Sequence, residues 1–165
     1  MHRVVTLDLS TERKRKCVPY LSEHVGFLAS LAQIRDLLRK HQCEQIVTAE
    51  KEVHDVKHGD YVLYTLAFLV KSEKFVIEFP VIFVTNSKGK TTLRMDITGR
   101  LIFYKIKSLL ADVEIGYLAF SEAMMQYQVI SLPDGHQMPL MDYVREHGKE
   151  LSAGTADLLQ LPGKR

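Results

Sequence analysis

The sequence contains no tryptophan and little cysteine, and it has no long hydrophobic run. Its two cysteines, Cys17 and Cys43, are too few for the disulfide framework of a small secreted domain, so we expect idle or buried thiols in a reducing compartment. The first residues include no apolar core of signal-peptide length, which predicts a cytoplasmic protein.

The apolar stretches are too short for a membrane. Residues 61–70 and 75–84 are the most apolar, and Lys71-Ser72-Glu73-Lys74 separates them. Each is about half of the ~20 residues that a spanning helix needs, so no membrane segment is expected. The hydrophobic share of 46% and the charged share of 25% are ordinary for a globular protein. The length of 165 residues predicts one domain, with residues 1–21 partly mobile and 152–165 poorly anchored.

The hydrophobic periodicity predicts an α+β fold. We expect a small antiparallel sheet of about three to five strands, packed against a mid-length helix and a long helix, with short C-terminal helices. Pro80 lies inside a predicted strand and indicates an edge or a bulge there. Gly99 lies inside the long helix and indicates that another backbone passes close to it. In chain order the expected elements are a strand at 3–9, a helix from a Ser22 cap to about Gln42, strands at 45–51, 61–70 and 75–84, a helix at 93–115 closed by Gly116, a helix at 121–127 capped by Ser121, a strand at 129–132, a turn at 133–135 and a helix at 138–147.

Charge is unevenly distributed along the chain. Residues 1–110 hold 18 Lys and Arg against 12 Asp and Glu, a net of +6, whereas residues 111–165 hold 4 against 8, a net of −4. A basic N-terminal part and an acidic C-terminal part indicate a polyanion partner or charge-paired self-association. The densest basic run is Arg13-Lys14-Arg15-Lys16, which cannot lie in a core.

Lys88-Gly89-Lys90-Thr91 stands between a predicted strand and a predicted helix, which is the context of a phosphate-binding loop. That motif needs a glycine five residues before Gly89, where this chain has Val84. A nucleotide loop is therefore not expected. Two alternatives stay open: lysines at a helix N-terminus that hold a nucleic-acid phosphate, or a plain Gly-Lys turn.

Catalytic and metal signatures are incomplete. His54 and His58 are four residues apart, but they flank a polar turn and no third or fourth ligand is evident. The serines, cysteines and histidines form no nucleophile elbow or other local signature, and the carboxylates are scattered. We therefore expect no enzyme, no metal site and no cofactor.

A set of cations and aromatic rings surrounds the predicted hairpin. Cations for phosphate and rings for base stacking are the combination that binds single-stranded nucleic acid. Phe75, Phe79 and Phe83 share one strand face and are expected in the core. Tyr61 and Tyr64 lie on opposite faces of their strand, so we expect at least one of them to be exposed. The predicted single-stranded DNA site consists of Arg13, Lys14, Arg15, Lys16, Lys71, Lys74, Lys88, Lys90 and Arg94 for phosphate and of Tyr61 or Tyr64 for a base.

The long helix at 93–115 suggests how the chain assembles. Its apolar stripe is broad, and Ile102 and Phe103 widen it, so it could form both core and dimer seam. The leading hypothesis is a homodimeric protein that binds single-stranded DNA. The alternative is a protein-interaction module that oligomerises through this helix without nucleic acid, and the third is an unrecognised metal-dependent nuclease.

Four stretches carry a resemblance to a known family. They are Ile34–His41, Val113–Met125, Ser131–Gly135 and Leu158–Gly163. Together they resemble an uncharacterised protein family that is widespread in phages and prokaryotic genomes, over roughly residues 34–163. The resemblance implies an association with recombination and single-strand DNA functions and no known catalytic residues. In layout the chain is also similar to the ThermoDBP-type single-stranded DNA-binding proteins, which combine a small antiparallel sheet with helices and dimerise.

Overall fold

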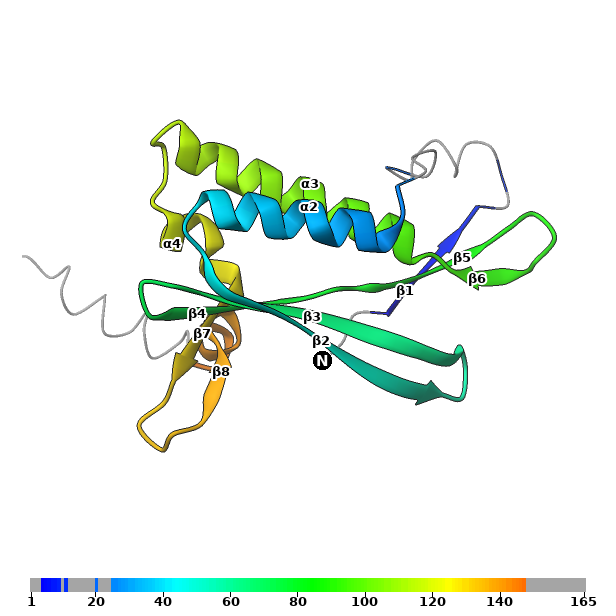
Figure 1. The fold of residues 1–165 in the computed structure, drawn as a ribbon. Coiled ribbons are helices and arrows are strands. Elements are labelled where there is room, and N and C mark those ends of the chain that lie inside the picture. The colour runs from blue at the N-terminus through cyan, green and yellow to red at the C-terminus, as the bar shows by residue number, and fades with distance from the viewer. Residues whose placement is uncertain (1–3, 10, 12–19, 21–24, 148–165) are drawn as a thin grey trace, which may run out of the picture.

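The computed structural model describes residues 4–9, 11, 20 and 25–147. It has an α+β fold in which helices α2 and α3 lie together on one side of the strands (Figure 1). The run Arg13–Lys16, Cys17 and the tail at 152–165 lie outside the described residues. The elements are β1 (Val4–Asp8), α2 (Phe27–Lys40), β2 (Glu44–Asp55), β3 (Gly59–Val70), β4 (Glu73–Glu78), β5 (Val81–Thr85), β6 (Thr91–Leu93), α3 (Met95–Glu114), α4 (Phe120–Met124), η1 (Met125–Tyr127), β7 (Gln128–Ser131) and β8 (Gln137–Pro139), followed by helical residues 140–147.

The strands form two sheets. The five-stranded sheet has the order β2-β3-β4-β7-β8 and is antiparallel throughout, as expected. The three-stranded sheet has the order β1-β5-β6, and in it Val4 of β1 lies opposite Val81 of β5 in a parallel pair. This second sheet was not expected, because local sequence gives no sign that β1 pairs with a strand so far along the chain.

Pro80 divides a segment that was predicted as one strand. β4 pairs with β3 up to Glu78, and β5 begins at Val81 in the other sheet. Proline has no N–H to donate to a ladder, so the five-stranded pairing ends where Pro80 stands. The hydroxyl of Thr98 in α3 donates a hydrogen bond to the Pro80 carbonyl at 3.0 Å, so the break is held against the long helix.

The core has three parts. The largest lies between the two helices and the β3–β4 face of the five-stranded sheet, with Ile34 and Ile106 fully buried there. A second lies between α3 and the three-stranded sheet, around Ile97. A third joins the two sheets, where Tyr61 packs with Phe83. The three-stranded sheet is therefore covered by α3 on one face and by the β2–β3 hairpin on the other.

Helices α2 and α3 run in the same direction and pack side by side (Figure 1). Gln33 accepts a hydrogen bond from Arg100 at 2.7 Å near their starts, and His41 lies 3.4 Å from Glu114 near their ends. A Cβ placed on Gly99 would lie 2.9 Å from the Cβ of Ser30. The close neighbour of Gly99 is therefore the side chain of Ser30 on helix α2, and not the backbone that was expected.

Helix boundaries agree with the sequence signals only in part. Gly116 adopts φ +73 directly after Ile115, the C-cap of α3, which confirms it as the residue that closes this helix. The predicted start at Ser22 is wrong, because α2 begins at Phe27 with Gly26 as N-cap. The ring of Phe27 packs 4.5 Å from that of Tyr64, a tertiary contact that a local capping signal does not contain.

The C-terminal elements follow the prediction with small shifts. The short helix starts after Ala119, whose N–H donates to Glu122 at 2.8 Å, and Ser121 is not its cap. The predicted turn at residues 133–135 is confirmed, and it joins β7 to β8. β8 occupies the first residues of the predicted helix, which is observed over 140–147.

Candidate nucleic-acid interface

Lys88 and Lys90 lie at the tip of the β5–β6 hairpin, which projects from one end of the fold (Figure 1). Both side chains are exposed. The side-chain oxygen of Asn86 accepts hydrogen bonds from the backbone N–H groups of Lys88 and Lys90, at 2.9 and 3.0 Å. Gly89 supplies the left-handed backbone, with φ +74. The tip is thus an ordered turn that carries two cations into solvent.

This placement corrects the strand-to-helix context predicted for Lys88-Gly89-Lys90-Thr91. Strand β6 intervenes, and α3 starts only at Met95. The β-branched pair Thr91-Thr92 explains the extra strand, since such residues favour the extended backbone. The two lysines therefore do not stand at a helix N-terminus, and neither a nucleotide loop nor a helix-end phosphate cradle forms there.

Arg94 precedes α3 and is engaged by a carboxylate. Its Nε and Nη2 atoms donate to Asp96 at 2.8 and 2.6 Å, and its backbone N–H donates to the Ile82 carbonyl at 2.8 Å. The hydrogen bonds from Arg94 hold the pKa of Asp96 below its ordinary value, against the opposing effect of burial. The charge of Arg94 is thus paired with that of Asp96 at the start of α3, and this placement does not favour phosphate contact.

The β2–β3 turn lies at the same end. The ring of His58 stacks on Phe83 of β5 at 4.9 Å, which ties this turn to the base of the β5–β6 hairpin. Lys57 is exposed at the turn and adds a third cation that sequence reasoning missed. Its signal was available, since a lysine within a polar turn is normally solvated.

The two histidines of this turn are each paired with a carboxylate. His54 Nδ1 lies 2.8 Å from Asp60, and His58 Nδ1 lies 3.2 Å from Asp55. The backbone N–H groups of His58 and Lys57 donate to Asp55 and lower its pKa. Within the described part of the chain, no three His, Cys, Asp or Glu side chains converge as a metal site would require.

The two tyrosines predicted to stack a base are packed inside the fold. Tyr61 is 8% exposed, and its ring meets Phe83 edge-on at a centroid distance of 5.8 Å. Tyr64 is partly buried against Phe27. Tyr61 packs against the three-stranded sheet and Tyr64 against the helices on the opposite face of β3, so the expectation of an exposed tyrosine does not fit the fold.

Lys71 and Lys74 lie at the β3–β4 turn, at the end of the fold opposite the β5–β6 hairpin (Figure 1). Lys74 donates to the side chain of Gln137 at 2.9 Å, and Lys71 borders a cavity. The structure therefore brings Lys88 and Lys90 together and separates them from Lys71 and Lys74. The predicted cations at Arg13–Lys16 lie outside the described residues.

The apolar stripe of α3 is used within the chain. Ile102 is buried in the main core and Phe103 packs against it. The exposed side chains of α3 are polar or small. This placement does not favour the expected dimer seam along the helix, because little of its apolar surface is left for a partner.

Comparisons with protein-family models, curated proteins and solved structures found no match to this chain. The resemblance to the phage-associated family therefore stays a prediction. None of the helices among the described residues has the length and apolarity needed to cross a bilayer.

Proposed function

We propose that the chain binds nucleic acid by contacting the phosphate backbone with the end built by the β5–β6 and β2–β3 hairpins. The observation that carries the proposal is the ordered, projecting tip with exposed Lys88 and Lys90, with Lys57 on the neighbouring turn. Exposed lysines contact phosphate without reading bases. The proposed activity is therefore sequence-independent, with single-stranded DNA as the first ligand to test.

The burial of Tyr61 and the partial burial of Tyr64 limit the affinity that such a site can reach. Without stacked bases, affinity comes from released counterions, and non-specific binding of this kind has dissociation constants of about 10⁻⁴–10⁻⁶ M. Three phosphate contacts give a slope of log affinity against log salt of about −2 for a single strand. Stacking rings would be needed for a strong preference for single strands over duplex.

Binding of labelled mixed-sequence single strand and of its duplex, measured by fluorescence anisotropy between low and physiological salt, tests the proposal. We expect weak, salt-dependent binding, and the double variant Lys88→Gln/Lys90→Gln should reduce the salt slope by about 1–2. The matched control is Arg39→Gln/Lys107→Gln, which removes the same charge from exposed positions on the helices and should bind nearly as the parent does. Equal effects of the two variants would remove the hairpin tip from the site, and no binding at low salt would overturn the function itself.

One observation favours the second candidate, a protein-interaction module. Ile115 and Tyr117 follow α3 and are 77% and 75% exposed. Large apolar side chains that lie close together on a surface often mark a protein contact. This candidate predicts self-association or partner binding that Ile115→Ser/Tyr117→Ser abolishes, and sedimentation at micromolar concentration checks the homomeric case.

A further inference from the structure

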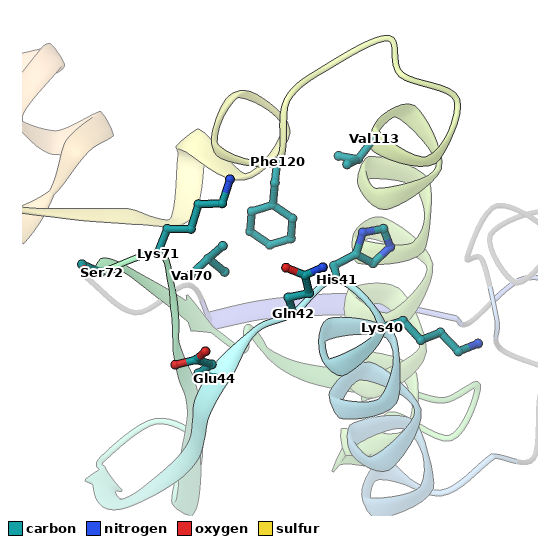
Figure 2. Close-up of a pocket in the computed structure, with 9 residues that line it drawn as sticks. All are labelled: Lys40, His41, Gln42, Glu44, Val70, Lys71, Ser72, Val113 and Phe120. Atoms are coloured by element: carbon teal, nitrogen blue, oxygen red, sulfur yellow. The ribbon is translucent and has the colours of Figure 1, made fainter.

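A cavity of about 460 Å³ opens where α2 ends, between the β3–β4 turn and α4 (Figure 2). Val70, Val113 and Phe120 contribute apolar walls, and polar side chains surround them. The volume falls within the range of about 300–1,000 Å³ typical of small-molecule sites. The β3–β4 turn and the start of α4, which border this cavity, lie at the opposite end of the fold from the β5–β6 hairpin (Figure 1).

The backbone around the cavity is unusual. Five described residues other than glycine have a positive φ, and three of them line this cavity: Gln42 (φ 61), Lys71 (φ 47) and Ser72 (φ 72). L-residues with side chains are disfavoured in the left-handed region. Such conformations gather at functional sites, where the surrounding structure enforces them.

Glycine or asparagine would adopt the same left-handed backbone more readily at these three positions. Gln42 directly follows the C-cap of α2 in a motif where Cys43 N–H donates to the Leu38 carbonyl at 3.1 Å. The end of α3 repeats this motif with Gly116 at the equivalent place. Lys71-Ser72 forms a two-residue hairpin turn with both residues left-handed, where Asn-Gly is the favoured pair. The chain thus holds longer polar side chains at the cavity where smaller residues fit better.

The side chains at the cavity combine three kinds of contact. Lys71 points toward Phe120, and the amide of Gln42 points into the space between Phe120 and His41, whereas Lys40 points away (Figure 2). The ring of Phe120 lies 6.2 Å from that of His41. His41 Nε2 is buried and makes no hydrogen bond, although Glu114 lies 3.4 Å away. A ligand here would meet an aromatic ring, an ammonium group and one buried ring nitrogen without a hydrogen bond.

We infer that this cavity binds a nucleoside monophosphate. The base would lie against Phe120, because aromatic rings stack on any base. The Gln42 amide has two donors and an acceptor, which suits a base edge that presents both. Lys71 is a compact cation suited to the phosphate, and His41 Nε2 would gain a partner in the sugar or base. This site is separate from the proposed contact with a nucleic-acid strand, which uses the other end of the fold.

Isothermal titration of the full chain with adenosine monophosphate tests this inference, with adenosine and inorganic phosphate as probes that each lack one part. We expect the monophosphate to bind at least 10-fold more tightly than either part. No binding at millimolar concentration would refute the inference, as would inorganic phosphate binding as tightly as the whole nucleotide.

The double variant Lys71→Asn/Ser72→Gly separates ligand binding from folding. It installs the favoured turn pair and removes the ammonium group, so the melting temperature should rise by about 2–6 °C while affinity for adenosine monophosphate falls at least 10-fold. Lys107→Gln is the control, since it removes one charge from an exposed position on α3 that does not line the cavity, and it should leave this affinity unchanged. Full affinity in the double variant would exclude Lys71 from the site and overturn the assignment.

Discussion

Arg94 holds Asp96 by two short hydrogen bonds at the point where α3 begins. The carboxylate also lies in the first turn of the helix, where negative charge is favoured by the helix dipole. Both side chains are about 30% exposed, at 31% and 29%, so solvent screens the pair only in part. The pair should therefore stabilise the fold in its ionised form.

Replacement of Asp96 by Asn should reduce the free energy of unfolding by about 1–2 kcal/mol at pH 7. The pKa of Asp96 is lower in the folded chain than in the unfolded chain, so this stabilisation is present above the unfolded value near 4. It is lost as the pH falls through the lower folded value. Urea unfolding of parent and variant at pH 7 and pH 3 measures the difference, which should shrink at pH 3.

The control for this prediction is Asp36→Asn. Asp36 lies 3.4 Å from Arg39 on the surface of α2, with both side chains more than 60% exposed, and such pairs contribute little. An Asp36 effect as large as that of Asp96, or a pH-independent Asp96 effect, would contradict the assignment.

At the level of single residues, the sequence predicted the exposure of the lysines but not the burial of the tyrosines. Lys88 and Lys90 are exposed as expected. Tyr61 is not, because its outer face is covered by a sheet whose strands come from distant parts of the chain. The positive φ of Gln42 could not be predicted, because glutamine is not a residue type that signals a left-handed backbone. Environment depends on tertiary pairing, and local pattern does not contain that information.

At the level of helices and strands, Gly99 allows α2 and α3 to pack closely. A Cβ at this position would lie 2.9 Å from Ser30 Cβ and 3.2 Å from the Phe27 ring. Gly99 and Ser30 are both fully or almost fully buried. The spacing of the two parallel helices at this point is therefore set by the missing side chain.

Gly99→Val should destabilise the fold by about 1–3 kcal/mol, because the added side chain forces the helices apart or distorts them. Chemical denaturation measures this change. Ser108→Val is the control, since it introduces the same β-branched residue at an exposed position of the same helix. Adding Ser30→Gly to Gly99→Val should recover part of the loss. Since valine has a higher helix propensity than glycine, a loss at position 99 no larger than that at position 108 would show that the contact with α2 does not set the cost.

Elements with strong local signals were predicted well. The hairpin around Lys71–Lys74, the long helix ending before Gly116 and the turn at 133–135 all correspond to observed elements. Pro80 marked the end of a ladder, yet the sequence did not state that the chain changes sheets there. The start of α2 was misplaced because packing of Phe27, and not a polar cap, fixes it.

At the scale of the whole molecule, the two proposed sites occupy opposite ends of one α+β body (Figure 1). The main core and the parallel helices α2 and α3 lie between them. Neither the parallel β1–β5 pair nor this separation of the lysines could be predicted, because both follow from how the two sheets assemble. The same separation makes the sites testable independently of each other.

Saturating adenosine monophosphate should leave the affinity for a labelled single strand unchanged within about 2-fold, since coupling between sites requires a ligand to favour one of two global states. The measurement is anisotropy of the strand with and without the nucleotide at constant ionic strength, so that added salt does not weaken binding by itself. The Lys88→Gln/Lys90→Gln variant supplies the reverse test, because its affinity for single-stranded DNA should fall while its affinity for adenosine monophosphate stays the same. Competition between the two ligands would mean that the strand enters the cavity at Phe120, and the phosphate contact would then have to be placed at Lys71 and not at the β5–β6 hairpin.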